Sequence, residues 1–215
     1  MKSILLIGLS NFGLLLLKQL SSRGHEIMAV DRDEDRINLI LPLVTDAQIG
    51  DSTNEAFLRS LGINNYDLCI VAIGKDLQSS LETTSLLRDL HAHYIVSRAD
   101  KEVQEKLLLR NGADEVIYPE KQIAEWAAIR YASNHLLDYV KLDNKHGIYE
   151  VAIPPAWIGR KIEEINIRKK YGINIMAIKD HGRMNLTVTP ETALGMDKTL
   201  LVLGEHAAVQ KCFHI

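Results

Sequence analysis

The stretch that decides the fold is residues 4–31, which read ILLIGLSNFGLLLLKQLSSRGHEIMAVD. It opens on the short apolar run Ile4–Ile7, passes through Gly8–Gly13, and continues with leucines at the spacing of one helical face. A second apolar run, Ile27–Val30, is closed by Asp31. Strand, glycine turn, helix, strand and acid in this order predict a mononucleotide-binding βαβ unit.

The residues of the turn each suit a part of this prediction. Gly8 would allow a tight turn, Gly13 would let the helix pack close to the sheet, and amides at the helix start would face phosphate. Ser10 replaces the middle glycine of the usual fingerprint, so its side chain either crowds the diphosphate or bonds to it. Asp31 could accept hydrogen bonds from a ribose, or it could cap the helix that follows. The context favours nucleotide binding over a purely structural turn.

Composition excludes several classes of protein. A net charge of -3 over 215 residues gives no reason to expect nucleic acid as a partner. No apolar run approaches the roughly 20 residues of a membrane span, and Ile4–Ile7 is too short for a signal peptide. We therefore expect a cytoplasmic protein. Its two cysteines, Cys69 and Cys212, are predicted to be reduced thiols, with Cys69 buried in a strand.

The alternation of strands and helices continues after residue 31. The apolar, β-branched run Leu68–Ile73 is typical of a central parallel strand. Further strands are predicted at Thr45–Ile49, Tyr94–Ser97 and Glu115–Tyr118, and helices at Asp33–Leu41, from Thr53 or Asn54 to Leu61, at Leu77–Leu90, and from Asp100 as cap to Leu109. Six strands in this order predict an α/β protein with a Rossmann-like doubly wound parallel sheet, which we assign to residues 1–136.

A different order of elements follows. Pro119 opens a helix with a stripe of small residues, which either contacts another subunit or packs on its own sheet. Beyond it we predict strands at Ile148–Ile153, Ile173–Ile178, Met184–Val188 and Thr199–Leu203, a helix at Gly159–Lys170, a hairpin turn at 180–183, and a last helix after Glu205. Residues 137–215 are thus predicted to form a small α+β domain, which we expect to pair with a second copy.

Candidate ligand contacts gather where the predicted parallel strands end, because such folds bind ligands there. Asp51 has the same two interpretations as Asp31, namely a ribose contact and a helix cap. Arg98 follows a strand and could bind phosphate, or it could pair with a carboxylate on the surface. Glu120 lies at a helix start, where its charge suits the helix dipole without any ligand.

Residues for redox chemistry are missing from the sequence. It contains no Tyr-x-x-x-Lys pair and no cysteine and histidine cluster with zinc spacing. This favours a sensor that binds a nucleotide over an enzyme that transforms one. A nucleotide-dependent oxidoreductase and a scaffold with a degenerate pocket remain the alternatives.

Several motifs together resemble a known family. In the first part of the chain these motifs are residues 7–13, 25–31, 65–67, 71–74, 112–114 and 119–121. In the second part they are residues 166–168, 170–172, 177–178 and 181–182. The chain resembles the regulatory subunits of Trk/Ktr-type potassium uptake, which carry a regulator-of-potassium-conductance (RCK) domain, and the resemblance covers nearly all of it. It implies dimers within a ring, expected to be octameric, at the inner face of the membrane beneath an integral membrane potassium-translocating protein. It also implies a non-enzymatic chain that binds ATP, ADP or NAD(H).

The resemblance also assigns residues. By position Asp31 would hold the ribose, Asp51 and Gly74 would line the adenosine pocket, and Arg98 would face phosphate. Glu120 would help to bind a cation at the dimer interface. The full expected cofactor set is Gly8, Ser10, Asn11, Phe12, Gly13, Asp31, Arg32, Asp51, Ser52, Ala72, Ile73, Gly74 and Arg98. A cyclic di-AMP site in the second domain would involve Arg168, Ile175, His181 and Pro190.

Two residues depart from the family pattern. They are Ser10 and Asn11, the latter standing where many Ktr-type members have an arginine that faces the terminal phosphate. Loss of such a charge-assisted contact removes roughly 1.5–3 kcal/mol. We therefore expect this chain to discriminate ATP from ADP less well than its relatives, or to prefer AMP or NAD(H).

Overall fold

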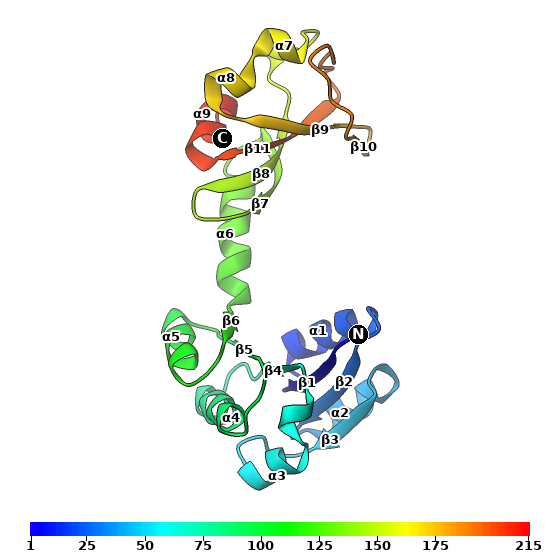
Figure 1. Ribbon diagram of the computed structural model, residues 1–215, viewed down its shortest axis with the longest axis vertical. Coiled ribbons are helices and arrows are strands. Elements are labelled where there is room, and N and C mark those ends of the chain that lie inside the picture. The colour runs from blue at the N-terminus through cyan, green and yellow to red at the C-terminus, as the bar shows by residue number, and fades with distance from the viewer. The chain divides into compact units, whose positions relative to one another are not determined.

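The computed structural model describes residues 1–215, which form two units, Met1–Gln122 and Ile123–Ile215. The first unit alternates strands and helices, as Figure 1 shows. Its elements are β1 Ser3–Ile7, α1 Asn11–Ser21, β2 Glu26–Asp31, α2 Glu34–Ile40, η1 Leu41–Leu43, β3 Asp46–Ile49, α3 Glu55–Ser60, η2 Ile63–Asn65, β4 Leu68–Val71, α4 Leu77–Asp89, β5 Ile95–Arg98, α5 Glu102–Arg110 and β6 Glu115–Ile117. Helix α6, Pro119–Tyr131, follows.

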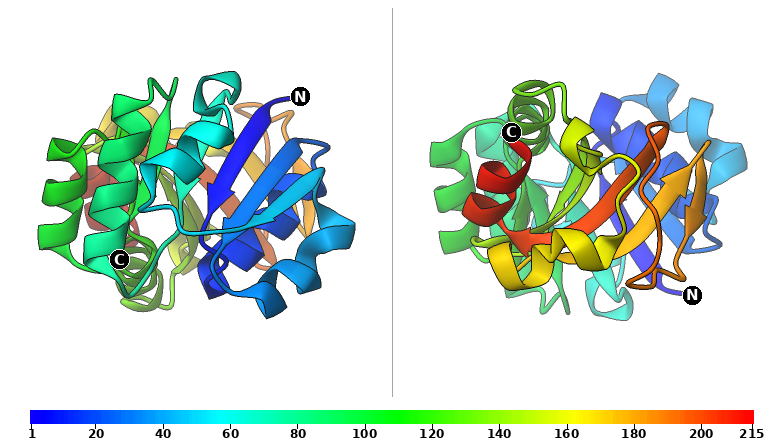
Figure 2. Two further views of the ribbon diagram at one scale, coloured as in Figure 1. Left: turned by 90° about the horizontal axis from the view of Figure 1, so that it is seen from below. Right: turned by 90° about the horizontal axis from the view of Figure 1, so that it is seen from above.

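The six strands form one parallel sheet in the order β3-β2-β1-β4-β5-β6. This is the strand order of the doubly wound dinucleotide-binding fold, so the predicted fold class is confirmed. In the left view of Figure 2, β1, β2 and β3 lie side by side in shades of blue. The order reverses between β1 and β4, and ligands bind at such a reversal.

The side chains of β1 point alternately to the two faces of the sheet, and both faces are covered by helices. Ile4 and Leu6 point to the face that packs against α1 and α2, whereas Leu5 and Ile7 point to the face that packs against α3 and α4. Every residue of this strand from Ile4 to Ile7 is nearly inaccessible to solvent. The apolar run thus places the turn after β1 between two packed layers.

Helix α4 is also held by buried hydroxyl groups. Thr83 bonds Ser52 at 2.8 Å between hydroxyl oxygens, and Thr84 bonds Ser97 at 2.9 Å. Both pairs are buried, and each joins α4 to a different part of the unit. The rotation of α4 about its axis is therefore set by directional bonds as well as by apolar packing.

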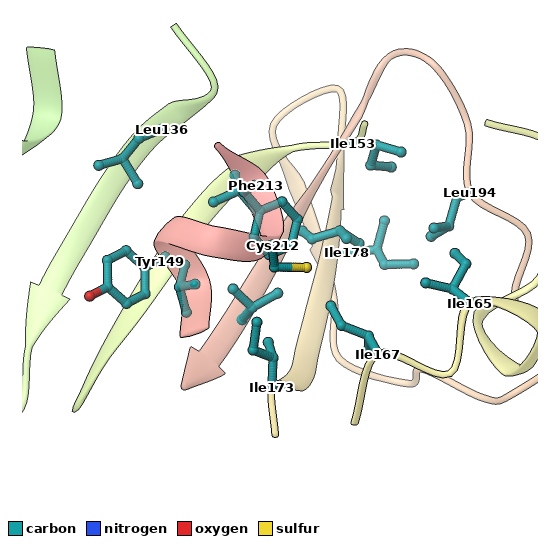
Figure 3. Close-up of a cluster of buried hydrophobic side chains, with 14 of the residues drawn as sticks. Leu136, Tyr149, Ile153, Ile165, Ile167, Ile173, Ile178, Leu194, Cys212 and Phe213 are labelled. Carbon is teal, nitrogen blue, oxygen red and sulfur yellow. The ribbon is translucent and has the colours of Figure 1, made fainter. Parts of the chain in front are cut away.

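The second unit is a five-stranded antiparallel sheet in the order β10-β9-β11-β8-β7. Its apolar core, which Figure 3 shows, gathers residues from these strands and from the helices that cover them. The elements are β7 Leu136–Lys141, β8 His146–Ala152, η3 Pro155–Trp157, α7 Ile162–Ile165, α8 Ile167–Tyr171, β9 Asn174–Asp180, β10 Arg183–Asn185, β11 Lys198–Glu205 and α9 His206–Phe213. Both the small α+β domain and the hairpin turn at 181–182 are as predicted.

Some predicted elements of the second unit were wrong in detail. The helix predicted at Gly159–Lys170 is two short helices, because Asn166 adopts the left-handed conformation, with φ of 55°, and ends α7. The strand predicted at Met184–Val188 is only Arg183–Asn185, and all three residues are exposed. Strand β7 was not predicted, since its alternation is interrupted by a bulge between Leu136 and Asp138.

Helix α6 crosses the division between the two units, which lies between Gln122 and Ile123. The sequence placed the end of the first domain at residue 136, after the helical pattern ends. The later part of α6 makes contacts within the second unit, since the Trp126 indole donates to Asp138 at 3.2 Å. No residue of α6 is buried, so packing of its stripe on its own sheet was wrong. Ile123 is 63% exposed and Tyr131 is 74% exposed.

None of the helices combines the length and the apolar character that crossing a bilayer requires.

Both thiols are expected to resist alkylation in the native protein. Cys69 and Cys212 are free and buried, and burial raises the pKa of Cys69 to about 12 and that of Cys212 to about 11. The reactive thiolate is therefore scarce at pH 8. Iodoacetamide at pH 8 should label neither thiol natively and both in denaturant, as intact mass would show. Rapid native labelling of Cys69 would contradict its burial.

Candidate functional site

A cavity of about 950 Å³ lies at the carboxyl ends of the central parallel strands. Its size is that of a pocket for a nucleotide-sized ligand. The residues that line it come from the ends of β1, β2, β3, β4 and β5, from α2, and from the starts of α1, α4 and α6: Ile7, Gly8, Ser10, Asn11, Phe12, Leu15, Val30, Asp31, Arg32, Arg36, Gly50, Ser52, Ala72, Ile73, Gly74, Lys75, Asp76, Ser79, Arg98, Asp100, Pro119 and Glu120.

The start of α1 faces this cavity. Gly8 has φ of +95°, which permits the tight turn, and a Cβ built on Gly13 would lie 2.1 Å from the Gly8 carbonyl oxygen. Ser10 is the N-cap: its hydroxyl accepts from the Gly13 N–H and donates to the Ala72 carbonyl at 3.0 Å. These bonds occupy the serine side chain.

Two donors at the helix start remain available. The hydrogen bonds of the chain leave the backbone N–H groups of Asn11 and Phe12 without an acceptor. Both residues line the cavity. The positive end of the helix dipole and two free N–H groups together suit an anion such as phosphate.

Asp31 ends β2 beside this turn. Its carboxylate accepts the Leu9 N–H at 2.5 Å and the Asp33 N–H at 2.9 Å, and its side chain is 10% exposed. Asp33, not Asp31, caps α2, so the cap role considered for Asp31 was wrong. A carboxylate has about four lone-pair sites, so acceptor capacity is left for hydroxyl groups of a ligand.

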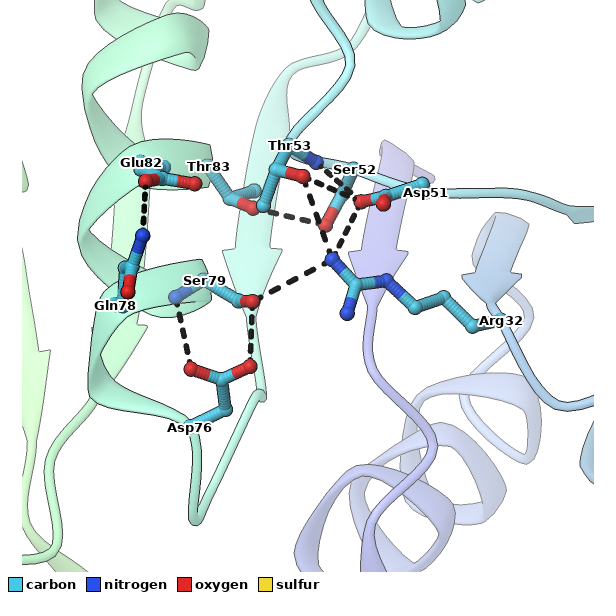
Figure 4. A network of polar contacts seen from close by, with 9 residues as sticks. All are labelled: Arg32, Asp51, Ser52, Thr53, Asp76, Gln78, Ser79, Glu82 and Thr83. Atoms are coloured by element: carbon cyan, nitrogen blue, oxygen red, sulfur yellow. Dashed lines mark hydrogen bonds and ion pairs between the residues drawn. The ribbon is translucent and has the colours of Figure 1, made fainter.

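Arg32, which lines the cavity, points toward Asp51, Thr53 and Ser79, as Figure 4 shows. The Nη2 of Arg32 lies 2.5 Å from the Asp51 carboxylate and 3.4 Å from the Ser79 hydroxyl oxygen. Asp51 also accepts from Thr53, and the Thr53 hydroxyl is the main cause that lowers the pKa of Asp51. Asn54 rather than Asp51 caps α3, so the cap role considered for Asp51 was wrong. Asp51 instead positions Arg32.

Arg98 ends β5 on the other side of the α1 start. Its guanidinium lies 5.4 Å from the centre of the Phe12 ring, and one Nη2 is 2.7 Å from Asp100 and 2.8 Å from Glu120. The Arg98 side chain is only 13% exposed. Asp100 was predicted as a helix cap, and this was wrong, since the N-cap of α5 is Lys101.

The cavity brings most of the predicted cofactor residues together. The predicted cofactor residues Gly13 and Asp51 do not line it, and the others do: Gly8, Ser10, Asn11, Phe12, Asp31, Arg32, Ser52, Ala72, Ile73, Gly74 and Arg98. Glu120, which was predicted for a cation, also lines it. The prediction missed several charged and polar lining residues: Arg36, Lys75, Asp76, Ser79 and Asp100. Lys75 and Asp76 follow directly on Gly74 after β4, so the same strand-end rule would have found them.

The residues predicted to bind cyclic di-AMP come from different segments of the second unit. Arg168 is on α8, Ile175 on β9, His181 in the β9–β10 turn and Pro190 between β10 and β11. The pocket at that turn contains His181 but none of the other three. Binding of cyclic di-AMP by these residues stays a prediction.

The donors available to a metal ion are few. No group of three or more His, Cys, Asp and Glu side chains could hold a metal ion. The carboxylates of Glu120 and Asp100 are both paired with Arg98. The residues of one chain therefore do not fit a cation centred on Glu120.

Comparison with known proteins identifies the family. The TrkA-N domain model matches residues 4–119, and the TrkA-C domain model matches residues 148–214. The chain belongs to the Trk/Ktr family of potassium-uptake proteins. The Ktr system potassium uptake protein C of Bacillus subtilis is 38% identical over 94% of this chain and 92% of its own length. Ktr system potassium uptake protein A of the same organism is 35% identical over 98% of this chain and 95% of its own length.

Solved structures share the fold of this Trk/Ktr family member. The GsuK RCK domain superposes with a TM-score of 0.68 at 20% identity, covering 99% of this chain and 47% of that one. A GsuK channel bound to NAD superposes with a TM-score of 0.70 at 22% identity, covering 97% of this chain and 39% of that one. The chain thus spans less than half the length of these two polypeptides. At this identity the likeness concerns the fold alone.

Proposed function

We propose that this chain is a regulatory subunit of potassium uptake that binds an adenine nucleotide, ATP, ADP or NAD(H), in the cavity of its first unit. Binding would favour one shape of an assembly and so gate a separate integral membrane protein that translocates potassium. The observation that carries the proposal is the pair of unpaired N–H groups at the start of α1, facing a cavity that also holds Asp31.

Each end of a nucleotide finds suitable groups in this cavity. Phosphate would accept from Asn11 and Phe12, and the ribose hydroxyls would donate to the remaining lone pairs of Asp31. The adenine end would lie toward Ser52 and Arg32. The GsuK channel of the same fold was solved bound to NAD, which supports this choice of ligand class.

A binding role is favoured over catalysis. The cavity lining contains no histidine, cysteine or tyrosine, and its four carboxylates are each engaged by backbone amides, a hydroxyl group or arginine: Asp31, Asp76, Asp100 and Glu120. Oxidation of NADH by the purified chain in the presence of candidate carbonyl compounds would instead support an oxidoreductase.

The assembly is proposed from the family and from α6. We infer dimers within an octameric ring at the cytoplasmic face of the membrane, with the exposed apolar residues of α6 as a subunit contact. Light scattering of the purified chain would report its mass, and a monomer at micromolar concentration would overturn this part of the proposal.

Ligand binding should raise the melting temperature of the protein. A ligand at a hundredfold excess over its Kd adds about 2.7 kcal/mol to the free energy of unfolding. We expect ATP, ADP and NADH all to raise it, and ATP and ADP to differ in affinity by less than about tenfold, because Asn11 supplies no charge for the terminal phosphate. Differential scanning fluorimetry with each nucleotide would measure this.

Two results would contradict these expectations separately. A strong preference for ATP over ADP would overturn the role given to Asn11. If no nucleotide shifts the melting temperature and none is released when the purified protein is denatured, the sensing function itself fails.

A further inference from the structure

The cluster around Arg98 places a charged group between two acids at the phosphate end of the cavity. Arg98 lies beside the start of α1, since its guanidinium stacks on Phe12 and a Cβ on Gly74 would lie 2.7 Å from its Nη1. On its other side one Nη2 contacts both Asp100 and Glu120. The same guanidinium thus faces the carboxylates and the helix end where phosphate would bind.

The family resemblance assigns Glu120 to a cation, and the contacts of Glu120 disagree with that role. Its carboxylate is 2.8 Å from the Arg98 guanidinium, which already balances its charge. A divalent ion bound there would lie within a few ångströms of that guanidinium and be repelled by it. Asp100 also lies 2.7 Å from the Arg98 guanidinium, which balances its charge, although its buried Oδ1 makes no hydrogen bond.

Arg98 retains hydrogen-bonding capacity that its present partners do not use. A guanidinium has five N–H donors. In Arg98 the same Nη2 contacts both Asp100 and Glu120, while Nε has no hydrogen-bond partner. Phosphate is a stronger partner than the Glu120 carboxylate, because a nucleotide phosphate carries more negative charge and because the carboxylate is 58% exposed to solvent, which weakens its ion pair.

We propose that Glu120 is a competitor of the nucleotide phosphate for Arg98, and that Arg98 rather than a metal ion at Glu120 neutralises the bound phosphate. This rests on the proposed nucleotide binding. Glu120 lies in the first turn of α6, where the helix dipole stabilises its charge once Arg98 turns to phosphate. Occupancy of the cavity therefore changes the charge partner of the first turn of α6.

The two roles of Glu120 predict opposite effects of one substitution. If Glu120 competes for Arg98, Glu120→Gln should tighten ADP binding about twofold to fivefold, the range for a partly exposed ion pair. If Glu120 binds a cation, the same change should weaken ADP binding in magnesium. Arg98→Gln should weaken ADP binding about tenfold to a hundredfold, the range for a charge-assisted contact.

The experiment is calorimetric titration of ADP into the full-length protein and its variants, each in magnesium chloride and in EDTA. We expect wild-type affinity to change by less than about threefold between the two buffers, because Arg98 supplies the positive charge. Glu105→Gln is the matched control, since Glu105 pairs with Lys121 but does not line the cavity. Its affinity for ADP should equal that of the wild type.

The outcomes separate this inference from the proposed function. Weaker binding by Glu120→Gln, or wild-type binding that is lost in EDTA, would overturn the competition while nucleotide binding stands. If the wild type binds ADP in neither buffer, the proposed function fails and the inference with it. Melting curves of each variant without ligand show whether it is folded, and Arg98→Lys serves if Arg98→Gln is not.

Discussion

Gly13→Ala is expected to lower the free energy of unfolding by about 3 kcal/mol or more, and to remove nucleotide binding with it. The added Cβ would lie 2.1 Å from the Gly8 carbonyl oxygen and 3.3 Å from the Ala72 Cβ. Helix α1 would have to move away from the sheet, and the turn cannot follow because Gly8 is already at φ of +95°. The gain in helix propensity, about 1 kcal/mol, does not offset this.

Gly24→Ala is the matched control for this substitution. Gly24, unlike Gly13, has a positive φ, at +74°, but nothing lies within 4 Å of its Cβ position. Its cost is therefore backbone strain alone, about 1–2 kcal/mol. Urea unfolding of both variants would measure the difference, and equal losses would contradict the close approach at Gly13.

Asp31→Asn is expected to weaken the binding of ADP or NADH by about a hundredfold while leaving the protein folded. Two hydroxyl groups of a ribose would lose a charged acceptor, and each such contact contributes about 1.5–3 kcal/mol. The amide oxygen of asparagine can still accept the Leu9 N–H, so the link between the glycine turn and β2 persists, while the exposed Asp33 N–H loses its acceptor. Calorimetric titration and a melting curve would report the two effects separately.

Asp33→Asn controls for the charge. Asp33 lies two residues further on, caps α2 and does not line the cavity, and asparagine is an equally good cap. Its affinity for nucleotide should stay within about twofold of the wild type, because an exposed charge outside the cavity contributes little. Unchanged binding by Asp31→Asn would show that Asp31 does not hold the ribose.

Local periodicity made the first unit predictable. The leucines after Gly13 and the two apolar runs around them determine strand, helix and strand within 28 residues, and parallel strands then require helical crossovers. Asp31 could be assigned because its distance from the glycines follows from this unit. Most of the cavity lining follows from the rule that such folds bind ligands at strand ends.

Contacts between side chains far apart in the sequence were beyond this reasoning. Arg32 meets Asp51 and Ser79, and neither pairing leaves a trace in local periodicity. Asp100 precedes a helix and so resembles a cap, yet a nearby buried guanidinium is the stronger partner for its charge. Asn166 interrupts a helical pattern through its backbone conformation, which residue type only weakly indicates.

The hydroxyl pairs under α4 have a consequence for how the cavity can respond to a ligand. Sliding or turning α4 would break the Ser52–Thr83 and Thr84–Ser97 bonds together, inside the protein, where no water replaces them. The side of the cavity built by Asp76 and Ser79 is therefore expected to keep its position when a ligand binds.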